Sequence, residues 1–243
     1  MTLKKDQFDK NLVYTNNEGR QVLARVVYDY KYLVDYHPYR KGNNPLFDDN
    51  SDKILRFKEG TQEAIEYFGN MIDEDFDSIW NDCYCVAVPS HDPTNNYKTP
   101  QDLSGQNLSP VQILIMSLQS KNSAVYELIE RLVKNQKGLH NGSAVLIRTH
   151  EVAKKSFGGN RDISVDLGSI EINSNCGIDI SGKNVLLIDD VITTGNSIAA
   201  CKMILKKGGA KNVFVLCLAK TSRDPYVSTD TSADVPFDEE VPF

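Results

Sequence analysis

The stretch Val-Leu-Leu-Ile-Asp-Asp-Val-Ile-Thr-Thr-Gly-Asn-Ser, residues 185–197, decides the expected fold. Its four branched apolar residues in a row are typical of a strand buried on both faces, as in a parallel sheet. We expect the strand to end at two adjacent carboxylates, Asp189 and Asp190, followed by a loop of hydroxyls and one glycine. From Ile198 the apolar residues recur at helical spacing until Gly208 and Gly209, so the pattern predicts strand, loop and helix.

Acids at the carboxyl end of a strand and small polar residues at a helix start suit a phosphorylated sugar. The loop amides and the helix N-terminus can hold a phosphate. The carboxylates can take hydroxyls or a magnesium ion. The alternative is a strand-to-helix crossover whose acids cap the helix, but a cap needs only one or two such residues. The Walker A and dinucleotide glycine signatures are not in this sequence.

The stretch resembles the phosphoribosyl-pyrophosphate (PRPP) motif of type I phosphoribosyltransferases, which has four apolar residues, two acids, two loose positions and Thr-Thr-Gly-x-Ser/Thr. Every position fits. The resemblance implies an α/β fold, a parallel sheet flanked by helices, with Mg²⁺ as cofactor. It also implies that Asp189 and Asp190 hold the ribose hydroxyls, directly or through magnesium. The amides and hydroxyls of the loop would anchor the 5′-phosphate: Thr193, Thr194, Gly195, Asn196 and Ser197.

Composition limits the function classes. The 243 residues are 40% hydrophobic and 25% charged, which suits one α/β domain with or without extensions. The net charge of -6 does not draw the chain to DNA or acidic membranes. No apolar run approaches the roughly 20 residues that span a bilayer, and the first residues lack the apolar core of a signal peptide, so we expect a cytosolic protein. The cysteines form no Cys-x-x-Cys pair, so buried reduced thiols are expected: Cys83, Cys85, Cys176, Cys201 and Cys217.

The order of the remaining elements follows from periodicity and turn residues. Residues 1–50 are expected to form a β-rich extension or hood, with a hairpin of residues 11–14 and 21–32 in a small appended sheet and a loop at residues 36–52. Residues 51–221 would form the phosphoribosyltransferase-like domain, and residues 222–243 a disordered tail. Within the domain the pattern predicts helices at 60–72 and, in two pieces, 109–136, and strands at 83–88, 144–147, 169–172 and 213–218.

Two further segments carry candidate cations. In the family, the loop after the first core strand binds pyrophosphate, and here it offers Ser90, His91 and Lys98. Residues 151–162 are polar and are expected to form a mobile flap, for which Arg148, Lys155 and Arg161 are the candidate substrate contacts. The alternative for all of these cations is a solvated surface position.

The order of elements over residues 50–221 resembles the ComF-like branch of the family. The echoes are Lys53-Ile-Leu-Arg-Phe-Lys58, Val88-Pro89 and the basic segment 148–161. ComF-like proteins bind PRPP and are associated with DNA uptake, but their reaction is poorly defined. They typically open with a cysteine-rich zinc module, which is not found before Cys83 in this sequence.

The last residues form a separate motif: Asp238, Glu239, Glu240, Val241, Pro242 and Phe243. An acidic cluster followed by apolar-Pro-Phe resembles the acidic tip of bacterial single-stranded-DNA-binding proteins, which docks on replication and repair enzymes. Residues 234–237 look like an earlier copy. The alternative is a solubilising acidic tail.

Two functions remain open from these patterns. The first is a PRPP-binding phosphoribosyltransferase-like enzyme that transfers or hydrolyses phosphoribosyl and releases pyrophosphate. The second is a non-catalytic PRPP or nucleotide sensor that reaches partners in DNA uptake, recombination or repair through its tail. Direct single-strand binding is disfavoured by the acidic balance and the lack of a basic aromatic patch. The acceptor and the oligomeric state are left open, with a dimer as one expected form.

Overall fold

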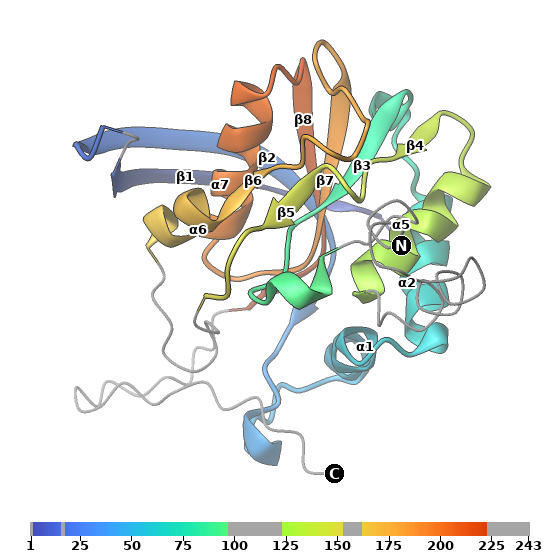
Figure 1. Cartoon of the computed structure of the whole chain (residues 1–243). Helices are drawn as coiled ribbons and strands as arrows, with labels where there is room; N and C mark the ends of the chain where they lie inside the picture. Colours follow the sequence, from blue (N-terminus) through green and yellow to red (C-terminus); the bar gives the residue numbers. More distant parts are fainter. Residues whose placement is uncertain (1, 16–17, 97–122, 153–161, 223–243) are drawn as a thin grey trace, which may run out of the picture.

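The computed structural model describes residues 2–15, 18–96, 123–152 and 162–222 (Figure 1). In this part of the chain, six strands form one sheet in the order β1-β2-β8-β7-β3-β4. The pairings from β2 to β4 are all parallel, and β1 runs antiparallel to β2. The strands are β1 (Lys4–Thr15), β2 (Gln21–Tyr36), β3 (Cys83–Ala87), β4 (Leu139–Asn141), β7 (Asn184–Ile192) and β8 (Asn212–Thr221). A second, antiparallel pair consists of β5 (Leu146–Arg148) and β6 (Ile170–Ile172).

Helices cover both faces of the sheet (Figure 1). One face carries α1 (Asp49–Lys58), α2 (Gln62–Glu74) and α5 (Ala124–Asn135), and the other carries α6 (Ile163–Ser169) and α7 (Asn196–Lys207). Successive side chains of β7 point to opposite faces of the sheet. Leu186 and Ile188 therefore join the first hydrophobic cluster, while Val185 and Leu187 join the second.

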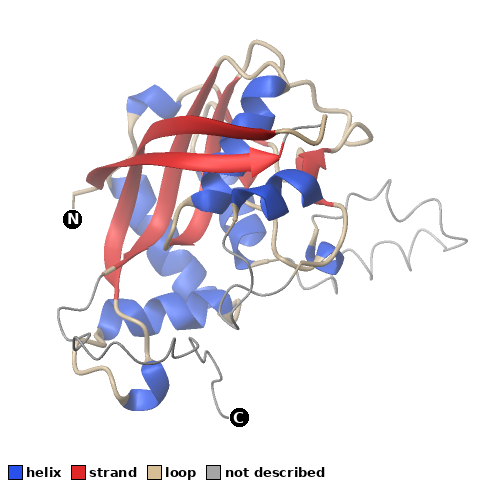
Figure 2. Ribbon diagram, turned by 90° about the vertical axis from the view of Figure 1, so that its left-hand side faces the viewer, coloured by secondary structure: helices blue, strands red, loops and turns tan. Residues whose placement is uncertain are grey.

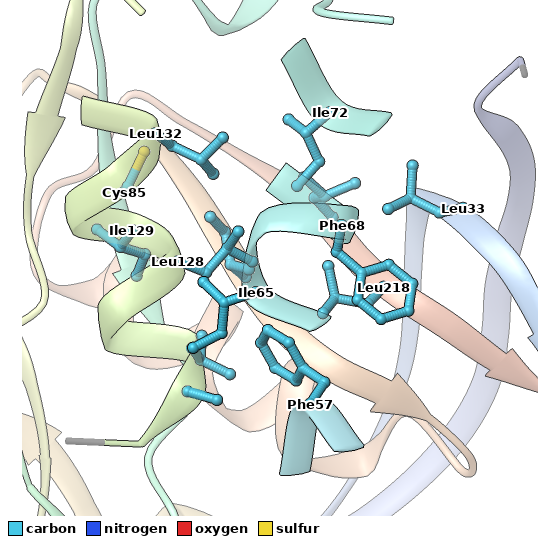
Figure 3. Close-up of a cluster of buried hydrophobic side chains, with 14 of the residues drawn as sticks. Leu33, Phe57, Ile65, Phe68, Ile72, Cys85, Leu128, Ile129, Leu132 and Leu218 are labelled. Carbon is cyan, nitrogen blue, oxygen red and sulfur yellow. The ribbon is translucent and has the colours of Figure 1, made fainter. Parts of the chain in front are cut away.

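The first cluster packs large side chains from three helices against the sheet (Figure 3). Phe57 of α1 and Phe68 of α2 meet edge to face, with ring centroids 5.8 Å apart. Leu128 and Ile129 of α5 are fully buried beside them. This dense apolar contact is what fixes the helical layer on the sheet.

The N-terminal hairpin β1–β2 does not form the small appended sheet that we expected. Its second strand pairs in parallel with β8, from Lys31 opposite Leu216 to Tyr36 opposite Thr221, so the hairpin extends the central sheet. The buried Leu33 and Val34 anchor this pairing in the first cluster. The rest of the hairpin twists across the face that carries α6 and α7 (Figure 2).

Several boundaries differ from the expected ones. The motif strand does not end at the two acids but continues to Ile192. Helix α1 begins at Asp49, inside the expected loop, and its N-cap Asp48 accepts a hydrogen bond from the Ser51 amide. Helix α6 and strand β4 were not expected, whereas α2 confirms the helix expected at 60–72. None of the helices in the described ranges is long and apolar enough to cross a membrane.

Candidate functional site

The two acids of the motif lie near the carboxyl end of the central strand β7. Asp189 is opposite Cys217 of β8, and the preceding Ile188 is opposite Ala87 of β3. Both carboxylates are half-buried. The carboxyl ends of five parallel strands meet at this edge, which is where ligands bind in open α/β sheets.

Each carboxylate is oriented by the backbone that follows it. The Asp190 amide donates to Asp189 Oδ1 at 3.0 Å, and the Val191 amide donates to Asp190 Oδ1 at 2.6 Å. Beneath them, burial raises the pKa of the Cys217 thiol well above its ordinary value, and the two carboxylates raise it further. Cys217 therefore stays a neutral thiol, and the negative charge at this edge belongs to the acids.

The loop of residues 193–197, the motif loop below, joins β7 to α7. Gly195 has φ +75°, in the left-handed region that favours glycine, and is the N-cap of the helix. No side chain caps this helix end. The first backbone N–H groups of α7 point out of this helix end, which is the arrangement that favours an anion.

The hairpin β1–β2 packs directly on the motif loop. The buried Tyr28 hydroxyl donates to the carbonyl oxygen of Gly195 at 2.9 Å, and Lys10 Nζ donates to that of Thr194 at 2.9 Å. Phe8 stacks on Tyr28 with ring centroids 4.7 Å apart. A Cβ atom on Gly195 would lie 2.6 Å from the Phe8 ring, so glycine is required for the close approach as well as for its φ.

The loop after β3, residues 88–96, starts beside the acids and is called the β3 loop below. The Val88 amide donates to the carbonyl of Ile188, one residue before Asp189. The Ser90 hydroxyl accepts from the Asp92 amide and from Asn95 Nδ2. The pKa of Asp92 lies below its ordinary value because Thr94 donates to its carboxylate through hydroxyl and amide. The structure thus brings Ser90 and His91 to the edge that holds the acids, while Lys98 lies outside the described residues.

Arg148 does not lie on a flap. It ends β5, its side chain is only 3% exposed, and its guanidinium is fully engaged by the protein. It donates to the carbonyls of Pro89 and Ser90, to the Ser169 hydroxyl and to Asp166 Oδ1. Residue type and sequence position do not reveal this role, because a buried arginine requires partners that come from distant segments. Lys155 and Arg161 lie outside the described residues.

Ser197 is also held by Asp166, a residue that no local sequence motif indicates. Its hydroxyl donates to Asp166 Oδ2 at 3.0 Å, and Asp166 is completely buried. The hydroxyl proton expected to reach a phosphate is therefore directed to Asp166 in this structure. Local sequence patterns could not identify four contact residues, because each acts across a long sequence separation. They are Asp166, Tyr28, Phe8 and Lys10.

The acids offer hard oxygen ligands of the kind that magnesium prefers. Magnesium usually keeps several waters and takes one or two carboxylates together with substrate phosphates. Two adjacent half-buried carboxylates fit that requirement. The described ranges contain no cluster of three or more metal-ligating side chains, so an all-protein cage is not present there.

A family model for the phosphoribosyl transferase domain matches residues 125–238. The matched residues are similar to a phosphoribosyl transferase domain and make up less than half of the chain. The match begins in α5 and includes β7, the motif loop, α7 and β8, whereas the hairpin, α1, α2 and β3 precede it. The parallel sheet with helices on both faces is accordingly a phosphoribosyltransferase-like α/β fold, as the motif predicted.

Curated relatives match a shorter stretch. A ribose-phosphate pyrophosphokinase from Corynebacterium glutamicum is 45% identical over 47 residues, which cover 19% of this chain and 14% of the relative. One from Pyrococcus furiosus is 53% identical over 38 residues, 16% of this chain and 14% of the relative. An adenine phosphoribosyltransferase from Corynebacterium jeikeium is 43% identical over 51 residues, 20% of this chain and 25% of the relative. The chain thus spans a small part of these relatives' length.

Solved structures include a hypoxanthine phosphoribosyltransferase from Staphylococcus aureus, with a TM-score of 0.31 and 14% identity. That alignment covers 70% of this chain and 64% of the other.

Proposed function

We propose that this protein binds PRPP with Mg²⁺ and transfers or hydrolyses the phosphoribosyl group, with release of pyrophosphate. The phosphoribosyl transferase domain and the local similarity to a pyrophosphokinase and a phosphoribosyltransferase support this proposal. The observation that carries it is the order of groups at one sheet edge: two half-buried carboxylates on β7, then a loop with a left-handed glycine, then the N-terminus of α7.

Each part of the edge suits one part of the ligand. The amides of the motif loop and of the first turn of α7 would hold the 5′-phosphate. Asp189 and Asp190 would accept hydrogen bonds from the ribose hydroxyls. The β3 loop would face the pyrophosphate, with backbone amides and His91 as its donors. A second reactant would then supply a lone pair to C1 while the C1–O bond to pyrophosphate breaks.

The protein would contribute position and charge rather than a nucleophile of its own. Cys217, the thiol in register with Asp189, is held neutral by burial and by the acids, so it offers no thiolate. Asp189 and Asp190 are the residues that would hold magnesium, which when bound would neutralise charge on the departing pyrophosphate. Lys98, Lys155 and Arg161, which lie outside the described residues, would add positive charge around the pyrophosphate.

Titration calorimetry tests the proposal directly. Wild type is titrated with PRPP in the presence of Mg²⁺, and the double variant Asp189→Asn with Asp190→Asn is titrated in parallel. Pyrophosphate release is then followed against a panel of purine and pyrimidine bases, and against water alone. We expect binding in the wild type that the double variant loses, and pyrophosphate release with at least one acceptor.

Ribose 5-phosphate is the control for the motif loop. It should bind to wild type through its phosphate and its ribose hydroxyls, and it should lose less affinity than PRPP in the double variant, because it carries no pyrophosphate for magnesium to neutralise. A wild type that binds neither PRPP nor ribose 5-phosphate would overturn the proposal. Circular dichroism of each variant excludes unfolding as the reason for lost binding.

A non-catalytic sensor is the second candidate, and two features favour it. The β3 loop has His91 as its sole cationisable side chain between residues 88 and 96, and the terminal residues resemble a docking tip. In this version the terminal residues would bind a replication or repair enzyme, as the ComF-like resemblance to DNA-uptake proteins also suggests. These residues are Asp238, Glu239, Glu240, Val241, Pro242 and Phe243. The segments 1–50, 51–221 and 222–243 would then serve as hood, ligand domain and partner-binding tail.

The tail has its own test. Binding of the full chain to an enzyme that accepts the acidic tip of single-stranded-DNA-binding proteins is compared with binding of a chain that lacks residues 241–243. Loss of binding with the truncation, and competition by a tip peptide, would support docking. Equal binding by both chains would refute it. PRPP binding without pyrophosphate release from any acceptor or water would favour the sensor over the transferase.

A further inference from the structure

A buried ion pair joins the two loops that line the proposed site. Arg148 Nη2 lies 3.1 Å from Asp166 Oδ1, and the two side chains are 3% and 0% exposed. The guanidinium also donates to the carbonyls of Pro89 and Ser90 in the β3 loop. The other carboxylate oxygen of Asp166 accepts from the Ser197 hydroxyl in the motif loop. One continuous chain of hydrogen bonds therefore runs from the β3 loop to the motif loop.

The surrounding contacts hold this chain in place. Arg148 Nη1 donates to the Ser169 hydroxyl at the end of α6, and that hydroxyl donates to the Val165 carbonyl. The Asn96 side chain makes both backbone hydrogen bonds of Arg148, accepting from its amide at 2.9 Å and donating to its carbonyl at 2.8 Å. The β3 loop is thus attached to β5 at both of its ends, at residues 89–90 and at residue 96.

Such a pair is poor at stabilising a fold but good at fixing geometry. Two charges removed from water gain little net free energy over apolar side chains of the same volume. Their directional hydrogen bonds, however, allow few arrangements of the segments that they connect. Arg148 and Asp166 together make hydrogen bonds to the β3 loop, to the motif loop and to the end of α6. A shift of either loop would therefore leave a buried charge without its partner.

We propose that the Arg148–Asp166 pair is a positioning device that holds the β3 loop and the motif loop at a fixed separation. A ligand that carries a pyrophosphate and a phosphate on one ribose then gains affinity over a ligand that carries only one of these groups. Neither residue needs to touch the ligand. This inference rests on the proposed function, because it assigns the two loops to the two ends of PRPP.

The gain arises because a connected ligand places its second group at high effective concentration once the first is bound. That gain is largest when the span of the ligand matches the distance between the sites, and it is lost when the geometry does not match. Loosening the connection between the loops should therefore weaken PRPP binding while leaving ribose 5-phosphate binding, which uses one loop, nearly unchanged.

The experiment compares two dissociation constants, for PRPP and for ribose 5-phosphate, both with Mg²⁺ present. Asp166→Asn keeps the volume and removes the charge that faces Arg148. Arg148→Lys keeps the charge but removes the planar donor set that reaches two carbonyls and a carboxylate together. Asp73→Asn is the matched control, because Asp73 accepts from Arg131 in a partly buried ion pair between α2 and α5 that contacts neither loop.

We expect Asp166→Asn and Arg148→Lys to reduce the preference for PRPP over ribose 5-phosphate by roughly 5- to 100-fold, the range typical of coupling between two sites. Asp73→Asn should leave the preference unchanged. A merely structural role would lower both affinities together, or lower the melting temperature without changing the preference, and either result would overturn the inference.

If both charged variants fail to fold, Ser197→Ala tests whether the connection between the loops sets the preference for PRPP. It removes only the last hydrogen bond of the chain, at a half-buried position, and leaves the ion pair intact. The inference requires that this variant, too, loses more affinity for PRPP than for ribose 5-phosphate. A wild type that binds neither ligand would overturn the proposed function itself, whereas wild-type binding with an unchanged preference in all variants overturns the inference alone.

Discussion

Tyr28 places a hydroxyl on the carbonyl of Gly195, at the point where the motif loop turns into α7. The same carbonyl accepts from the Ala199 amide, the first hydrogen bond of the helix. Burial raises the pKa of Tyr28, so the hydroxyl keeps its proton at all ordinary pH values. A single residue of the hairpin therefore helps to set the direction of the helix N-terminus that would face a phosphate.

Replacing Tyr28 with phenylalanine tests this role. Tyr28→Phe keeps the stack on Phe8 and removes one hydrogen bond, which is worth about 0.5–1.5 kcal/mol net. We expect the affinity for ribose 5-phosphate to fall by roughly 2- to 12-fold, the equivalent of that free energy. Calorimetric titration measures the change.

Tyr30→Phe is the matched control for Tyr28→Phe. Tyr30 lies two residues further along β2, and its hydroxyl donates to Asp6 rather than to the motif loop. The control should lose a similar amount of stability and none of the affinity. Equal affinity losses in the two variants would show that the hairpin acts only through general stability.

At the scale of elements, the hairpin is fastened to the sheet by a small polar cluster on its first strand. Asp6 accepts from Lys220 of β8 and from Tyr30 of β2. The hydrogen bond from Lys220 is the main reason that the pKa of Asp6 falls to about 2, and the Gln7 amide and Tyr30 lower it further. The folded pKa lies below the ordinary value of 3.8, so the ionised Asp6 stabilises the fold.

This contribution has a defined pH window. It is fully present above the ordinary pKa of 3.8 and is lost as the pH falls towards the folded pKa of about 2. We therefore expect Asp6→Asn to lower the free energy of unfolding at neutral pH by no more than about 1 kcal/mol, because exposed ion pairs are screened by water. Urea unfolding at several pH values should show the difference from wild type shrinking below pH 3.8. A difference that stays constant down to pH 2 would contradict this account.

Local patterns predicted the elements better than their contacts. The β-branched and aromatic residues and the turn before them indicated the hairpin. Its position over the motif loop, however, depends on Phe8 and Tyr28 meeting Gly195, residues far apart in the chain. Helix α1 was missed because its start lies in a segment rich in Pro, Gly and Asn. The cap at Asp48, with Ser51 three residues later, was the available signal.

At the scale of the whole molecule, the described residues form two apolar layers that share one sheet. Leu128 of α5 belongs to the first cluster and Leu205 of α7 to the second, and both are fully buried. Strand β7 contributes to both clusters through alternate residues, so neither layer can lose its packing without disturbing the other. The fold should consequently unfold as one cooperative unit.

Trp80, the single tryptophan of the chain, reports on this cooperativity because it is buried in the first cluster. Leu128→Ala and Leu205→Ala should each lower the free energy of unfolding by roughly 2–5 kcal/mol. Both variants should shift the midpoint of the Trp80 fluorescence transition, although only Leu128 lies in the cluster of Trp80. A Trp80 midpoint that Leu205→Ala leaves unchanged, while circular dichroism shows an earlier loss of helix, would mean that the layers unfold separately.

The motif strand and the order of the core elements could be predicted at this scale because apolar periodicity and the Asp189-to-Ser197 pattern are local. The position of Arg148 could not. A basic residue at the end of a short strand is usually solvated, and its burial here depends on two other segments, the β3 loop with Pro89 and Ser90 and helix α6 with Asp166. Long-range polar networks of this kind leave no periodic trace in a sequence.

The burial of the cysteines has a practical consequence for optical work on this molecule. Four thiols are buried. Burial raises the pKa of Cys83 to about 12 and also raises the pKa of Cys85 and of Cys217, so these sulfurs resist alkylation. Cys176 is the half-exposed exception, between β6 and the start of β7, and so towards the sheet edge opposite the acids. A maleimide dye should attach there first, which would label the chain away from the proposed site without engineering it.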